Sequence, residues 1–180
     1  MELWDVYDKY RNLTGKTVIR KEKGALEEDE YGLVVHVAVF NKNGEMLIQQ
    51  RQTTKEQYPN LWDISAGGHS IAGECSEEAI HRETLEEIGY NYDFSNIRPY
   101  FTINYEDGFG DVYIINNCEL DLDNFKMQPE EVQNITWANK NEILQLMDEN
   151  KFVPYENGFI ELLFSLRNRK RGIIRSKLED

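Results

Sequence analysis

Residues 68–90 read GHSIAGECSEEAIHRETLEEIGY and carry most of the information on fold and chemistry. The second half predicts a helix over Ser76–Ile88, because Ser76 can act as its N-cap and acidic residues follow at the positive end of the helix dipole. Gly89 suits the left-handed position that commonly ends a helix. The Gly67-Gly68 pair ahead of it allows the backbone to approach a metal ion or a phosphate closely, because no Cβ stands in the way.

Three carboxylates share one face of this predicted helix. At about 100° per residue, Glu83, Glu86 and Glu87 project to the same side. Arg82 is a single cation among these acids, and a hard divalent cation such as Mg²⁺ relieves repulsion between carboxylates. The alternative is a solvated acidic face. The buried stripe on the other side is predicted to be Ile80, Thr84, Leu85 and Ile88.

The spacing of these residues matches a known motif. Residues 68–90 resemble the Nudix box, G-x5-E-x7-R-E-U-x-E-E-x-G-U, where U is a bulky apolar residue, at all seven fixed positions. Thr84 stands where an aliphatic residue is usual and Tyr90 is aromatic, and neither departure touches the chemistry. The resemblance extends over about residues 32–166. It implies an α/β fold, a Nudix-type α/β/α sandwich with a mixed sheet.

The resemblance also implies Mg²⁺- or Mn²⁺-dependent hydrolysis of a diphosphate linked to another group. The expected metal ligands are the carboxylates of Glu83, Glu86 and Glu87 and the carbonyl of Gly68. Arg82 is expected to act in catalysis by orienting the glutamates. Structural support of the loop is expected from Glu74, Gly67 and Gly89.

The general base varies within this family, because either a box glutamate or one from a distant loop can take the proton. Glu86 is the first candidate. Glu131, which follows Pro129 and Glu130, is the second. The alternative for Glu130 and Glu131 is a pair of exposed loop acids.

A second resemblance is to the Nudix-related isopentenyl-diphosphate isomerases. It rests on residues before the box, namely Phe40-Asn41, Gly44, Arg51, Lys55, Pro59, Trp62 and Gly68-His69. Those enzymes need a Cys directly before the Gly-His pair and a His at the start of the first core strand. Gly67 and Gly32 stand at these positions, so we expect no isomerase activity.

The shared basic residues can still bind a diphosphate. Arg51 ends a predicted strand and Lys55 follows in a loop, where both could offset phosphate charge. His69 could contact the substrate or a metal ion. The alternatives are surface charges for Arg51 and Lys55 and a merely exposed ring for His69. His36, in an apolar strand, is expected to be a hydrogen-bonded core residue.

The remaining elements follow from hydrophobic patterns and turn residues. Predicted strands cover 33–40, 46–51, 97–105, 111–116 and 132–137, with a short apolar stretch at 61–65 and further helices at 141–149 and 158–166. The turn between 97–105 and 111–116 is expected at 108–110. We expect an N-terminal extended hairpin within 1–31, with strands 3–10 and 17–20 around a turn at 14–16, a Nudix domain over 32–166 and a basic tail over 167–180. The tail is either a solvated helix end or a polyanion-binding segment.

The chain of 180 residues has 20 Lys and Arg against 33 Asp and Glu, a formal net charge of −13. Such a surface repels nucleic acids and anionic lipids, so neither is expected as a partner. The resemblance to the Nudix family implies a small phosphorylated metabolite as the partner. Two cysteines, no signal-peptide pattern and no long apolar run predict a cytoplasmic protein. The oligomeric state stays open, a homodimer included. A ligand-sensing domain without turnover is a third hypothesis, disfavoured by the intact box.

Overall fold

The computed structural model describes residues 2–20 and 25–168, so the basic residues predicted to form a tail after 168 lie outside the described part. The chain forms two compact units. Unit 1 takes its residues from 1–37 and 66–113, and unit 2 from 38–65 and 114–180. Two long strands, β3 (Gly32–Asn41) and β8 (Gly108–Cys118), begin in unit 1 and end in unit 2.

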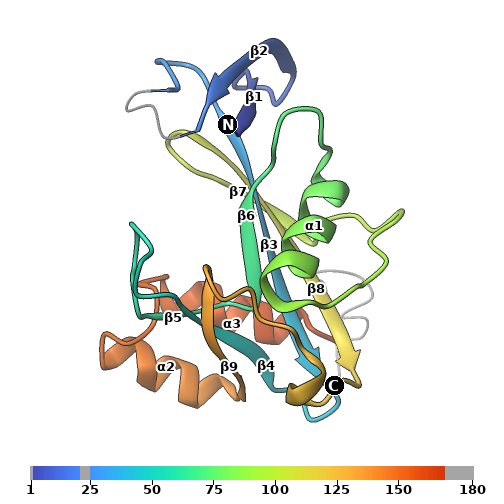
Figure 1. The fold of residues 1–180 in the computed structure, drawn as a ribbon, viewed down its shortest axis with the longest axis vertical. Coiled ribbons are helices and arrows are strands. Elements are labelled where there is room, and N and C mark those ends of the chain that lie inside the picture. The colour runs from blue at the N-terminus through green and yellow to red at the C-terminus, as the bar shows by residue number, and fades with distance from the viewer. Residues whose placement is uncertain (1, 21–24, 169–180) are drawn as a thin grey trace, which may run out of the picture. The chain divides into compact units, whose positions relative to one another are not determined.

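Unit 1 contains a sheet and a separate N-terminal hairpin (Figure 1). In the sheet, β6 (Ala66–His69) pairs antiparallel with β3, and β7 (Phe101–Asn104) pairs antiparallel with β8. The hairpin consists of β1 (Leu3–Tyr7) and β2 (Leu13–Ile19). The register places Gly68 opposite Val35. The sheet thus fixes the start of the 68–90 segment.

The helix α1 covers Ser76–Ile88 with the predicted bounds. Its N-cap is Cys75, whereas Ser76 was expected, because the Glu78 carboxylate accepts a hydrogen bond of 2.8 Å from the Cys75 N–H. Ser76 lies in the first turn. Gly89 ends the helix with φ +67°, as predicted, and donates its N–H to the Leu85 carbonyl at 3.0 Å.

The buried face of α1 differs at three positions from the expected stripe, and one of them is Ala79, which is also buried. Ile80, Thr84 and Ile88 are buried, but the Leu85 side chain is 45% exposed. Glu87 is buried instead, because α1 lies beside β6 (Figure 1) and the Glu87 carboxylate faces its backbone. On the buried face of α1, the charged side chain of Glu87 therefore stands where Leu85 was expected.

The two turns that the sequence predicts within unit 1 lie at other residues in the structure. The hairpin turns at residues 8–12, where the Asp8 carboxylate accepts bonds from the N–H groups of Tyr10 and Asn12 and Arg11 adopts φ +65°. The turn expected at 14–16 is part of β2. Likewise, β8 already begins at Gly108, so the chain turns at 105–107 and not at 108–110. Side-chain capping by Asp8 outweighs the Gly15 signal.

The part of unit 2 that the structure describes contains three further strands and two α-helices. The strand β4 (Met46–Arg51) pairs antiparallel with the end of β3, with β5 (Trp62–Asp63) and with β9 (Val132–Ala138). The helices are α2 (Lys140–Asp148) and α3 (Asn157–Leu166), and a 3₁₀ turn, η1, covers Leu122–Asn124. No helix within 2–20 and 25–168 is long and apolar enough to cross a membrane.

Candidate active site

Gly67 and Gly68 each lie against a different glutamate of α1. The Gly67 N–H donates a hydrogen bond of 3.1 Å to Oε2 of Glu87. A Cβ added at Gly68 would lie 2.4 Å from Oε1 of Glu83, closer than any real Cβ contact. The absence of a side chain at Gly68 therefore makes room for a carboxylate directly against the backbone.

Arg82 connects most of the predicted site residues in unit 1. Its Nε and Nη2 donate to the two oxygens of Glu74 at 2.8 and 3.0 Å. Its Nη1 donates to Glu83 at 2.7 Å and to Glu86 at 3.3 Å, and Nη2 also donates to the His69 carbonyl at 3.0 Å. One guanidinium thus orients the helix carboxylates and the loop backbone together. Glu74 also accepts the Ile71 N–H at 3.1 Å, the loop contact expected of it.

The three predicted metal ligands differ in exposure. The side chains of Glu83 and Glu86 are 12% and 52% exposed, and Glu87 as a residue is 6% exposed. Burial raises the pKa of Glu83, and the neighbouring Arg82 only partly opposes this effect. A buried carboxylate whose charge is incompletely balanced gains from an added cation.

The fit of a divalent ion can be judged from the donors themselves. Carboxylate oxygens and a backbone carbonyl are the ligands that Mg²⁺ and Mn²⁺ prefer. The described residues nevertheless contain no preformed group of three or more acidic, His or Cys side chains arranged for a metal. Arg82 already contacts Glu83 and Glu86, so a cation occupies part of the space between the acids. The donor set fits a hard cation, although the side chains of Glu83 and Glu86 are directed at Arg82.

His69 lies against the N-terminal hairpin. Its ring stacks on Trp4 with the ring centroids 3.9 Å apart and the planes within 4°. Burial, followed by the charge of Arg20, lowers the pKa of His69 to about 4, so the imidazole is neutral at pH 7. His36 is also held neutral by burial, which lowers its pKa to about 4, and it contacts the Tyr105 hydroxyl at 3.2 Å. The hydrogen bond expected for His36 is present.

A buried aspartate that the sequence analysis did not single out holds the first turn of α1. Asp111 is fully buried and accepts bonds from Ser76 Oγ at 2.6 Å and Thr102 Oγ1 at 2.6 Å. Arg11 contacts both of its oxygens. Burial raises the pKa of Asp111, but the bonds from Arg11, Ser76 and Thr102 outweigh this effect and lower it overall. The sequence signal that could have indicated this role is a single aspartate within a predicted apolar strand.

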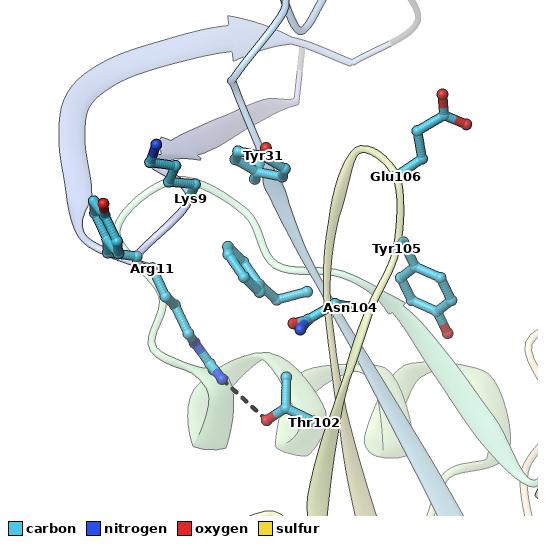
Figure 2. A pocket seen from close by; sticks show the side chains of 9 residues that line it. Lys9, Arg11, Tyr31, Thr102, Asn104, Tyr105 and Glu106 are labelled. Carbon is cyan, nitrogen blue, oxygen red and sulfur yellow. Dashed lines mark hydrogen bonds between the residues drawn. The ribbon is translucent and has the colours of Figure 1, made fainter.

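A cavity of about 510 Å³ opens beside this cluster (Figure 2). Figure 2 shows Arg11 reaching from the hairpin turn to Thr102 on β7, at a distance of 3.2 Å. The cavity is lined by Lys9, Tyr10, Arg11, Tyr31, Thr102, Asn104, Tyr105, Glu106 and Phe109. None of these residues belongs to the 68–90 segment.

The remaining predicted site residues lie in unit 2 and pair with one another or with a neighbour. Arg51 forms an ion pair with Asp63 at 3.1 Å, and Tyr155 donates to the same carboxylate at 2.9 Å. Burial raises the pKa of Asp63 although Arg51 opposes it. Lys55 and Glu131, expected to bind substrate and to act as a base, form an ion pair with each other.

Comparison with known proteins places the chain in a family. A family model, the NUDIX domain, matches residues 30–161. An uncharacterized Nudix hydrolase of Listeria monocytogenes is 42% identical over 168 residues, covering 93% of this chain and 96% of that protein. A solved structure from Deinococcus radiodurans is 22% identical, with a TM-score of 0.72 over 93% of this chain and 100% of that chain. An isopentenyl-diphosphate Delta-isomerase of Corynebacterium diphtheriae is 26% identical over 122 residues, covering 63% and 67% of the two chains.

The chain therefore belongs to the Nudix hydrolase family and is a hydrolase of pyrophosphate bonds. The expected α/β fold class, with a mixed sheet and three helices, is confirmed. Enzymes of this family generally use divalent metal ions and small phosphorylated substrates. The isomerase resemblance is also present among the relatives, at lower identity.

Proposed function

We propose that this protein is a Mg²⁺- or Mn²⁺-dependent pyrophosphohydrolase that cleaves a diphosphate linkage in a small nucleoside-diphosphate-type or related metabolite. The single observation that carries the proposal is the placement of two glutamates, one buried and one largely buried, against two adjacent glycines. Glu87 accepts the Gly67 N–H, and Glu83 occupies the space that a Gly68 side chain would fill. Such burial of acids is costly unless a cation compensates them.

Glu83, Glu86 and Glu87, with the Gly68 carbonyl, are the proposed metal ligands. A bound divalent ion supplies positive charge beside phosphate oxygens and makes water more acidic. Arg82 holds the side chains of Glu83 and Glu86 in place before any ion arrives. Glu74 fixes Arg82 in turn and holds the loop through Ile71. Hydrogen bonding to Glu74 raises the pKa of Arg82, so this side chain stays charged.

Glu86 is the proposed general base, because it is the most exposed of the three box carboxylates and can receive a proton from water. Glu131 is the second candidate, and its carboxylate is engaged by Lys55. Glu86 also contacts a cation, Arg82 at 3.3 Å, but it shares that guanidinium with Glu74 and Glu83. The Glu86 side chain is 52% exposed against 30% for Glu131, and this greater access to water supports Glu86 over Glu131.

Arg51, Lys55 and His69 are the proposed substrate contacts. Arg51 and Lys55 each already face one carboxylate of unit 2, so each would exchange that partner for a phosphate oxygen. His69 is neutral at pH 7 because burial lowers its pKa, and it would contact the substrate by hydrogen bonding or stacking, without adding charge.

The test is a panel of nucleoside diphosphate derivatives and other diphosphate metabolites with Mg²⁺ or Mn²⁺, read as phosphate released after coupling to a phosphatase. We expect release from at least one class of substrate and none when the metal is chelated. Replacing Glu86→Gln should reduce kcat about a hundredfold or more, and Glu131→Gln only a few fold. Equal losses in both variants would contradict the assignment of the base.

An isopentenyl-diphosphate isomerase is the second candidate, favoured by the relative from Corynebacterium diphtheriae. The site opposes it, because a Cβ added at Gly67 would lie 2.6 Å from the Val35 carbonyl oxygen. A cysteine at this position would therefore need a shift of the sheet backbone. Deuterium exchange into isopentenyl diphosphate distinguishes the two functions, and we expect none. Tight binding of panel compounds without turnover would instead favour a ligand-sensing domain.

A further inference from the structure

The N-terminal hairpin precedes the residues that the family model matches, which begin at residue 30. The hairpin nevertheless contacts the stretch from His69 to Ser76, the link between the glycines and α1. Three independent sets of contacts join them, and all lie within unit 1. The N-terminal hairpin, which lies outside the residues that the family model matches, therefore contacts the 68–90 segment that carries the proposed chemistry.

The first contact is the stack of Trp4 on His69, directly after Gly68. The indole is also held at its edge, because Trp4 Nε1 donates to Glu2 at 3.2 Å and Arg20 pairs with the same carboxylate at 2.7 Å. Stacked rings at this distance stabilise each other beyond the burial of their surface. The orientation of the His69 residue thus depends on β1.

The second contact is made by the backbone of the loop. The Ala72 N–H donates to the Leu3 carbonyl at 2.8 Å, and the Gly73 N–H donates to the Asp5 carboxylate at 2.7 Å. Gly73 has φ +90°, a conformation that side-chain-bearing residues rarely adopt. The charge-assisted hydrogen bond from the Gly73 amide to Asp5 therefore holds the loop at this residue of positive φ.

The third contact lies at the end of the loop. Arg11 contacts both oxygens of Asp111, and the same carboxylate receives the bond from Ser76 in the first turn of α1. The hairpin turn and the first turn of the helix are thus joined through one buried aspartate. Removing Arg11 would leave Asp111 with two hydroxyl donors and no cation.

We propose that Trp4, Asp5 and Arg11 are positioning residues for the 68–90 segment. The N-terminal hairpin thus supports the activity of the hydrolase by holding this segment in place. The three residues act through the loop and touch neither the proposed metal ligands nor a substrate. This inference rests on the proposed function, because the geometry they hold is that of the Gly68 carbonyl and the α1 glutamates.

The test measures Mn²⁺ affinity by electron paramagnetic resonance and amide hydrogen exchange at Ala72 and Gly73 by NMR. Trp4→Ala should weaken Mn²⁺ binding about tenfold, as loss of a supporting contact does at metal sites, and should accelerate exchange at both amides. Trp4→Phe should restore most of both. Asp5→Ala should resemble Trp4→Ala, whereas Asp5→Asn keeps an acceptor oxygen and should resemble the wild type.

Leu13→Ser is the matched control, since Leu13 belongs to β2 and is 61% exposed. Wild-type Mn²⁺ affinity in Trp4→Ala, or an equal loss in Leu13→Ser, would overturn the inference. Failure of the wild type to bind Mn²⁺ would be a failure of the proposed function. The exchange data then decide alone: faster exchange in Trp4→Ala that Trp4→Phe reverses supports the inference, and unchanged exchange overturns it.

Discussion

The two units each contain basic side chains that contact acidic side chains, but the balance of charge differs. In unit 2, Arg51 faces Asp63 and Lys55 faces Glu131, one cation for each carboxylate. In unit 1, Arg82 alone contacts three carboxylates, and a further buried glutamate lies next to them on α1. Each of these unit 2 acids thus has one cation to itself in the charge count, although burial still raises the pKa of Asp63. The unit 1 cluster has an excess of negative charge that an added cation would offset, which is why we assign the chemistry there.

The substitution with the largest expected effect on the charge excess of unit 1 is Glu87→Gln. Glutamine keeps the shape and the acceptor oxygen that receives the Gly67 N–H, but it removes one charge of the excess. We expect kcat/KM to fall about a thousandfold, because metal-assisted stabilisation contributes several kcal/mol to the barrier. Glu77→Gln on the same helix is the control and should stay active. Full activity of Glu87→Gln would refute the role of that residue.

The balanced pair is tested by Arg51→Met, which leaves the buried Asp63 without its cation. We expect the free energy of unfolding to fall by about 3 kcal/mol in urea denaturation. Adding Asp63→Asn should recover most of this loss, since no charge is then left unpaired. The KM of the double variant separates the two roles of Arg51: an increase of several fold supports the proposed phosphate contact, and an unchanged KM contradicts it.

The close approach at Gly68 predicts a loss of activity for Gly68→Ala. The new Cβ would meet Glu83 Oε1 at 2.4 Å and displace that carboxylate. A displacement of about 1 Å at such a site costs about a hundredfold in kcat/KM. Gly158→Ala in α3 is the control, because nothing lies within 4 Å of a Cβ there. Equal kcat/KM in the two variants would show that the contact has no catalytic consequence.

The Asp111 cluster predicts a pH-dependent effect on stability. The bonds from Arg11, Ser76 and Thr102 lower the pKa of Asp111 below its usual 3.8 despite burial. The stabilisation by the ionised form is therefore complete above pH 3.8 and is lost as pH falls through the lower, folded-state pKa. Asp111→Asn should lower the free energy of unfolding by about 2 kcal/mol at pH 7. A wild-type minus variant difference that stays constant from pH 7 to below 3.8 would contradict this account.

Local patterns in the sequence predicted the elements that depend on local interactions. The α1 bounds, its Gly89 end and the resemblance to the Nudix box follow from spacing within residues 68–90. The turn at 8–12 was missed because one side chain, Asp8, captures two backbone amides and outweighs the glycine signal at 15. The exposure of Leu85 was missed because Glu87 takes the buried position through a bond to β6.

Pairings between distant residues were beyond the sequence. Arg11 and Asp111 are 100 positions apart, and Lys55 and Glu131 are 76 apart. The charges alone do not say which partners meet, because the acids greatly outnumber the basic residues. The sequence indicated the carboxylate excess of the 68–90 segment and, through the resemblance, that Arg82 orients the glutamates, but not that one guanidinium would contact Glu74, Glu83 and Glu86 together.

The most direct measurement of the charge excess on α1 is a Mn²⁺ titration of the wild type and of the Glu83→Gln/Glu87→Gln double variant, followed by electron paramagnetic resonance. The account predicts saturable binding to the wild type and at least about a hundredfold weaker binding to the double variant, whose fold is checked by circular dichroism. Equal Mn²⁺ affinity in the two proteins would contradict it.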